Sequence, residues 1–226
     1  WKKYTTSRTY ITGYPRFDYC SPNYPRPERD AIIEKCGLQK NKKIVLFASY
    51  EPYMYVEAQH GIDKNIKNKK ILKNIHNGYL LSLYDAHEQT MQALEKFAMQ
   101  NKDKYQVVVK VHPMERKIFD TKKCKPEIKI SKTMVKYFKQ PTDYMMTAID
   151  QDITDCSMSK NLLVAADVVI GWCSTMLLEA MMLGKPVIHT LFDNTAELNL
   201  YQEYEKCFLT ARNEDELSEA IINAVP

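Results

Sequence analysis

Two hydroxyl side chains stand at an expected helix N-terminus within residues 167–188 (DVVIGWCSTMLLEAMMLGKPVI), a segment that predicts a strand, a helix and a second strand. Gly171 ends the first strand, and Ser174 and Thr175 then occupy the usual positions of a helix cap. Because the first N–H groups of a helix lack partners within it, this helix end would stabilise a phosphate group. The sequence leaves two roles open for the hydroxyls, anion binding or helix capping alone.

A histidine follows another predicted strand. Residues 106–111 form the run QVVVKV, which is typical of a strand buried on both faces, and His112 and Pro113 come next. Proline ends the strand and fixes the turn, so a ring nitrogen of His112 could donate a hydrogen bond to a phosphate oxygen. The alternative is a structural histidine paired with a backbone carbonyl. The carboxyl ends of parallel strands meet at one edge of a sheet, so His112 and residues 171–175 should reach one phosphate group if their strands are neighbours.

A carboxylate, Glu179, follows the hydroxyl pair by more than one helical turn. There it would lie near a bound ligand and could accept hydrogen bonds from ribose hydroxyls, as the acidic residue of dinucleotide-binding folds does. A solvated helix surface is the alternative, although the neighbouring residues are apolar and a buried carboxylate needs a partner. His87, by contrast, lies on the apolar face of a predicted helix and is expected to be structural.

Composition and missing motifs exclude several classes of protein. The 226 residues are enough for one large α/β domain or two small ones, and the net charge of +4 suits an anionic small ligand but is too weak to indicate nucleic acid. The absence of GxGxxG after the first strand, and of GxxxxGK[ST] and GxSxG, argues against a dinucleotide oxidoreductase, a P-loop enzyme and a serine hydrolase. Six cysteines without CxxC pairs or metal-type spacing predict reduced thiols and no metal site.

Strands and helices alternate along the chain, which predicts an α/β fold with a doubly wound, Rossmann-like parallel sheet covered on both faces. The expected strands are residues 43–48, 106–111, 167–171, 186–190 and 207–210. The expected helices are residues 27–37, 78–100, 159–166, 176–183 and 214–224. Residues 50–77 are expected to form a mobile or ligand-ordered loop. The pattern of residues 121–158 is ambiguous. There we predict short strands at 128–131 and 135–138 and a helix at 143–149.

Four segments in this order resemble a known family: TGYPRFD (12–18), KKIVLFAS (42–49), VVVKVHP (107–113) and AADVVIGWCSTMLLEAMMLGKPVI (165–188). They resemble the C-terminal half of GT-B-type glycosyltransferase-like enzymes, in particular the CDP-glycerol glycerophosphotransferase family and transferases of capsule or surface carbohydrate. The resemblance implies two Rossmann-like domains with a nucleotide-activated donor between them. Residues 38–226 would form the donor-binding domain, after an N-terminal segment, residues 1–37, that crosses between the domains.

The resemblance also assigns roles to particular residues. His112 would contact a donor phosphate and act in catalysis, Glu179 would lie near the ribose, and Arg16 would lie near the crossover between domains. The residues expected to bind the donor are His112, Pro113, Gly171, Cys173, Ser174, Thr175, Glu179 and Arg16. Hydrogen-bond donors around the phosphates would stabilise the leaving nucleotide. The base for the acceptor hydroxyl would lie on a missing N-terminal domain, and neither a metal nor a separate cofactor is expected.

The expected function is that of a transferase for surface polysaccharide or teichoic-acid-like polymer synthesis, with a CDP-, CMP- or UDP-linked donor and a glycan or polyol acceptor. Two alternatives stay open, a UDP-sugar 2-epimerase and a noncatalytic nucleotide-sugar-binding module. No signal peptide or membrane-spanning run is visible, which predicts a cytoplasmic location, with peripheral association of the full-length protein at the inner membrane face left open. Because the first residue is Trp1, the chain is expected to be part of a longer or processed protein.

Overall fold

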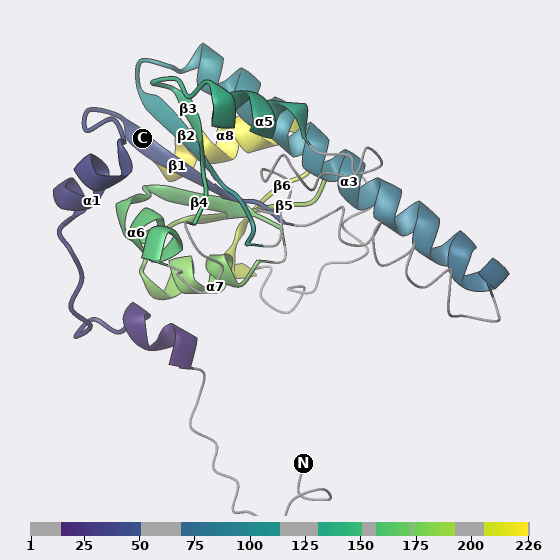
Figure 1. Ribbon diagram of the computed structural model, residues 1–226, viewed down its shortest axis with the longest axis horizontal. Helices are drawn as coiled ribbons and strands as arrows, with labels where there is room; N and C mark the ends of the chain where they lie inside the picture. The colour runs from purple at the N-terminus through teal and green to yellow at the C-terminus, as the bar shows by residue number, and fades with distance from the viewer. Residues whose placement is uncertain are drawn as a thin grey trace, which may run out of the picture.

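Six strands form one sheet in the order β3-β2-β1-β4-β5-β6 (Figure 1). The computed structural model describes residues 15–50, 69–113, 131–150, 157–172, 174–192 and 206–225. The strands are β1 (Lys43–Ala48), β2 (Tyr105–Lys110), β3 (Met145–Ala148), β4 (Val168–Gly171), β5 (Val187–Thr190) and β6 (Leu209–Ala211). Every neighbouring pair is parallel. The chain builds β2 and β3 on one side of β1 and then β4, β5 and β6 on the other, which confirms the predicted doubly wound sheet.

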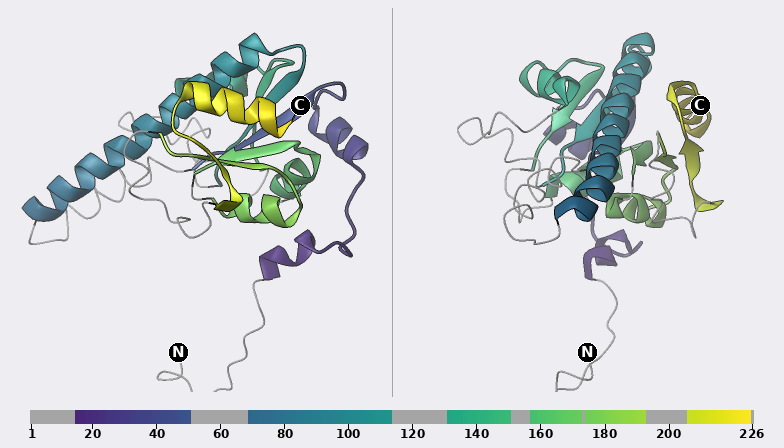
Figure 2. Two further views of the ribbon diagram at one scale, coloured as in Figure 1. Left: turned by 180° about the vertical axis from the view of Figure 1, so that it is seen from behind. Right: turned by 90° about the vertical axis from the view of Figure 1, so that its right-hand side faces the viewer.

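Helices cover both faces of this sheet (Figures 1 and 2). The first face packs against α3 (Lys69–Gln100), α5 (Lys132–Lys139) and α8 (Glu214–Ala224). The second packs against the 3-10 helix η1 (Pro15–Cys20), α1 (Arg29–Cys36), α6 (Ser157–Ala165) and α7 (Thr175–Met182). Since successive side chains of a strand point to opposite faces, β1 sends Val45 and Phe47 into the first core and Ile44 and Leu46 into the second.

Short local signals set the ends of the helices. The side chain of Ser131 caps α5 by accepting a hydrogen bond from the N–H of Met134 at 3.3 Å. Asn213 caps α8 in the same way, accepting from the N–H of Glu216 at 2.9 Å. Gly184 follows α7 with a φ of +71°, in the left-handed region that glycine adopts without strain. The predicted cap and stop of these last two helices are therefore confirmed.

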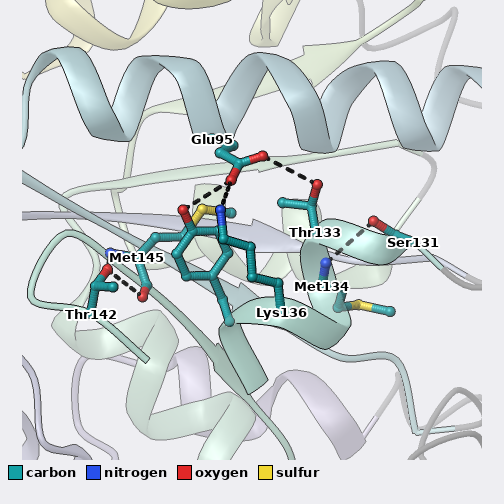
Figure 3. A network of polar contacts seen from close by, with 8 residues as sticks. Glu95, Ser131, Thr133, Met134, Lys136, Thr142 and Met145 are labelled. Carbon is teal, nitrogen blue, oxygen red and sulfur yellow. Dashed lines mark hydrogen bonds and ion pairs between the residues drawn. The ribbon is translucent and has the colours of Figure 1, made fainter. Parts of the chain in front are cut away.

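A cluster of polar contacts fastens α5 to α3 (Figure 3). Glu95 of α3 accepts hydrogen bonds from Lys136 Nζ at 2.6 Å and from the hydroxyl of Tyr137 at 3.0 Å, both on α5. After α5, the hydroxyl of Thr142 bonds to both backbone groups of Met145 at 3.0 Å and closes the turn into β3. These contacts hold α5 against α3 and close the turn into β3, which pairs with β2.

This segment also corrects the prediction for residues 131–150. The prediction of a strand at 135–138 is wrong, because these residues lie in α5, which buries Thr133, Met134 and Tyr137 at helical spacing. The prediction of a helix at 143–149 is also wrong, because residues 145–148 form β3. Met and Ala favour helices, but pairing with β2 overrides that local preference. Of the strand predicted at 128–131, only Ser131 belongs to the described residues.

The other helix and strand boundaries differ less from the predicted ones. α3 begins at Lys69, so residues 69–77 of the predicted loop are helical, and the helix continues through Gly78 at a cost of about 1 kcal/mol relative to alanine. Its N-terminal part projects beyond the sheet (Figures 1 and 2). Residues 51–68 of that loop lie outside the described residues. The last strand is Leu209–Ala211 rather than 207–210. None of the described helices combines the length and apolar composition needed to cross a bilayer.

Candidate functional site

Two groups of predicted site residues lie at the ends of β2 and β4, on either side of β1. In the parallel register, Ala48 at the end of β1 pairs with Lys110 of β2 and with Gly171 of β4. The strand order reverses between β1 and β4, and ligands of doubly wound sheets bind outside the strand ends at such a point. His112 follows β2 by two residues and Ser174 follows β4 by three, so both lie at this edge.

The strands that lead to His112 and to Ser174 are not neighbours, which corrects the geometry assumed for one shared phosphate. β1 lies between them, so the ends of β2 and β4 are two strand spacings apart, about 10 Å. His112 and the N-terminus of α7 therefore lie on opposite sides of the end of β1. This separation suits an extended anion such as a diphosphate better than a single phosphate group.

Ser174 caps α7. Its Oγ accepts a hydrogen bond from the N–H of Met176 at 3.3 Å, and its carbonyl accepts from the N–H of Leu177 at 3.0 Å. Of the two roles that the sequence leaves open, capping is thus observed for Ser174, which is half-buried. Thr175 is exposed at the first position of the helix. Phosphate binding by Thr175 and by the helix end stays a prediction.

Gly171 allows α7 to approach the end of β1 closely. A methyl group at this position would lie 3.2 Å from the carbonyl oxygen of Ala48 and 3.2 Å from Cδ2 of Leu177, tighter than ordinary van der Waals contact. The carbonyl of Gly171 also accepts a hydrogen bond from the hydroxyl of Thr190 at 3.3 Å. Gly171 is therefore needed for close packing, which brings the first turn of α7 to the edge of the sheet. Cys173, next in the predicted site, lies outside the described residues.

A buried polar and aromatic cluster follows the end of β1, on the face of the sheet that α3 covers. Ser49 Oγ lies 2.9 Å from His87 Nε2 of α3, and the ring of Tyr50 packs between those of His87 and Trp172 at centroid distances of 4.9 and 5.0 Å. Burial lowers the pKa of His87 to about 4, so the ring is neutral at pH 7. His87 is 1% exposed, and the prediction of a structural histidine is confirmed.

Glu179 lies on the buried side of α7 and is 1% exposed. The hydroxyl of Tyr19 in η1 donates to its Oε2 at 2.7 Å. Burial, together with this carboxylate, raises the pKa of Tyr19 above its usual value. The alternative of a solvated carboxylate is therefore excluded, and the partner that a buried carboxylate needs is Tyr19. Contact with a ribose stays a prediction. Arg16 lies in the same 3-10 helix, and its side chain is outside the part of the structure described.

A comparison with models of protein families shows to which family this chain is related. A model of the CDP-glycerol:poly(glycerophosphate) glycerophosphotransferases matches residues 2–225. The chain belongs to this family. The resemblance inferred from four short segments is thereby confirmed, and the match extends through the regions between them. No protein of curated function matches the sequence.

Several solved structures are similar to this chain at low sequence identity. A structure of the wall teichoic acid polymerase TagF has 12% identity and a TM-score of 0.48, with 92% of this chain and 39% of that chain covered. The ADP-heptose LPS heptosyltransferase II of E. coli has 9% identity and a TM-score of 0.47, with 90% and 53% covered. WaaG, a glycosyltransferase involved in lipopolysaccharide biosynthesis, has 14% identity and a TM-score of 0.47, with 93% and 45% covered. The chain thus spans roughly two fifths to one half of these proteins.

Sequence reasoning missed two buried polar pairs at the same edge of the sheet. They are Ser49 with His87 and Lys110 with Asp150. A lysine within the apolar run QVVVKV was an available signal, since a buried charge needs a partner. Its partner could not be found, because Asp150 follows a strand that was predicted as a helix. Within the described ranges, no three His, Cys, Asp or Glu side chains are grouped so as to hold a metal ion.

Proposed function

We propose that this chain is the donor-binding domain of a transferase that uses CDP-glycerol, or a related nucleotide-activated polyol phosphate or sugar, to extend a teichoic-acid-like or other surface polymer. The observation that supports the proposal most directly is the placement of His112 and the N-terminus of α7 on both sides of β1. They lie where the strand order reverses, in a chain of the glycerophosphotransferase family. Family membership favours this reaction over that of a UDP-sugar 2-epimerase.

The chemistry follows from where negative charge develops. A hydroxyl of the polyol or glycan acceptor attacks the phosphorus atom that carries the glycerol. The bond from this phosphorus to the bridging oxygen breaks, and CMP leaves with the electron pair. Hydrogen-bond donors fixed around the diphosphate stabilise that charge without reorganising. The N-terminus of α7 with Thr175 would hold one phosphate group, and a ring nitrogen of His112 would donate to the other.

The rest of the reaction needs groups that lie outside this chain. We assign acceptor binding, and the base that removes the hydroxyl proton, to an N-terminal domain. Residues 1–37 would cross between the two domains and residues 38–226 would bind the donor, without a metal or a separate cofactor. The transfer would take place on the cytoplasmic side, with the full-length protein associated peripherally with the inner face of the membrane.

A thermal-shift comparison of CDP-glycerol, CMP, UDP-N-acetylglucosamine and GDP tests donor binding. A ligand at about 100 times its dissociation constant should add about 2.7 kcal/mol to the free energy of unfolding. We expect CDP-glycerol to stabilise the chain most, with the same result in EDTA. Stabilisation by UDP-N-acetylglucosamine alone would favour the epimerase, and no stabilisation by any nucleotide would contradict a donor-binding role.

A further inference from the structure

A buried ion pair stands two residues before His112. Lys110 Nζ lies 2.7 Å from Asp150 Oδ2, and the two side chains are 2% and 4% exposed. Side chains alternate along a strand, so Lys110 points to the same face of the sheet as Val108, toward α6. There Ser159, in the first turn of α6, donates to the same carboxylate oxygen at 3.3 Å. The pair therefore joins β2, the end of β3 and α6.

The same ammonium group fixes the peptide bond that carries His112. Lys110 Nζ donates to the carbonyl oxygen of Val111 at 2.6 Å, and the N–H of Val111 donates to the carbonyl of Ala148 in β3 at 3.0 Å. Both backbone polar groups of Val111 are thus held. On the other side, the ring of Pro113 restricts the backbone. His112 stands between two restrained residues at the edge of the sheet.

Stability alone does not account for an ion pair at this place. A buried pair of charges can often be replaced by apolar side chains of similar volume without loss of stability, because desolvation offsets the attraction. Asp150 also keeps one buried oxygen, Oδ1, for which the described residues supply no hydrogen-bond partner. The arrangement costs desolvation, and what it provides is a rigid connection to the residue before His112.

We propose that Lys110, oriented by Asp150, is a positioning residue for His112. Its ammonium group fixes the peptide between Val111 and His112 and so holds the imidazole where it meets the donor phosphates. The inference rests on the proposed role of His112 in donor binding, but the fixing of the backbone can be measured without a ligand.

The chain offers a matched control at the opposite edge of the sheet. Lys42, whose side chain is 6% exposed, donates to Asp143 Oδ2 at 2.7 Å and to the carbonyl of the same residue at 2.9 Å. Lys42 directly precedes β1, and Asp143 stands shortly before β3. This pair also joins a buried lysine to an aspartate and to a backbone carbonyl, with the difference that the side chain of Asp143 is 63% exposed. It lies at the amino ends of the strands and cannot act on His112.

The test compares the double variants Lys110→Met/Asp150→Asn and Lys42→Met/Asp143→Asn by calorimetric titration of the chain with CDP-glycerol. Removing both charges at once avoids an unpaired buried carboxylate, so the first variant should fold. We expect it to lower the affinity about tenfold, and to cause no further loss when His112→Ala is already present. The second variant should change nothing in either background. Equal losses with and without His112, or no loss at all, would overturn the proposal.

Backbone relaxation of the free chain gives the second readout. The order parameter of the His112 amide should fall from the value of a rigid backbone, about 0.85, toward about 0.6 in Lys110→Met/Asp150→Asn and stay unchanged in the control. An unchanged value overturns the positioning role even if CDP-glycerol does not bind. Two other outcomes would instead refute the proposed function: a wild-type chain that does not bind CDP-glycerol, or a His112→Ala variant that binds it as tightly as the wild type.

Discussion

His112 is the single residue on which the proposed donor site depends most. In His112→Ala, the donor should lose one charge-assisted hydrogen bond, which corresponds to about 1.5–3 kcal/mol of binding free energy. The side chain is half-buried at the end of β2 and outside both cores, so the melting temperature of the free chain should change little. Calorimetry with CDP-glycerol beside a melting curve without ligand separates the two effects. Equal affinity of the variant and the wild type would remove His112 from the site.

At the scale of elements, the N-terminus of α7 combines a structural and a binding role that substitutions can separate. Ser174→Ala removes an observed cap and should destabilise the chain by about 1 kcal/mol. Thr175→Ala should leave stability unchanged but weaken nucleotide binding, because this hydroxyl is exposed at the helix end. Chemical denaturation and nucleotide titration of both variants check this.

Asn213→Ala supplies the control for capping. Asn213 caps α8 through a comparable hydrogen bond, at 2.9 Å, so its loss should cost about as much stability as Ser174→Ala. Nucleotide affinity should not change, because no part of the proposed site involves α8. If Asn213→Ala weakened binding as strongly as Thr175→Ala, the effect at α7 would reflect general destabilisation.

At the scale of the whole molecule, stability should fall at acid pH because a histidine is buried on each face of the sheet. Burial lowers the pKa of both His87 and His189 to about 4, whereas histidines of an unfolded chain titrate near 6.5. The unfolded state therefore takes up protons first, and stability that is present above about pH 6.5 is lost as the pH falls toward 4. For the fully buried His87 the whole difference is worth about 3 kcal/mol.

Urea unfolding at pH 7 and at pH 5 measures this loss. His87→Gln keeps a side chain that can bond to Ser49 but cannot titrate, so the variant should lose less stability than the wild type between the two pH values. An equal loss in both proteins would contradict this prediction, because it would mean that folding does not lower the pKa of His87.

Local sequence patterns determined most of the fold. Apolar runs such as residues 44–48 and 107–109 identify strands buried on both faces, because only such strands need apolar side chains at every position. Asn213 and Gly184 mark helix ends because their side-chain and backbone chemistry acts within one turn. Local preference failed at β3, whose residues favour a helix and form a strand only because β2 is there to pair with.

Within the candidate site, the sequence by itself determined which residues follow strand ends, since His112 and Ser174 are recognised from their own neighbours in the chain. Only the tertiary structure decided that β1 separates them, that Glu179 turns inward to meet Tyr19, and that Lys110 finds Asp150. These contacts join residues far apart in the chain, and no local pattern encodes them. Strand order and the burial of charge are settled by packing of the whole sheet, where each buried polar group must find its partner across the fold.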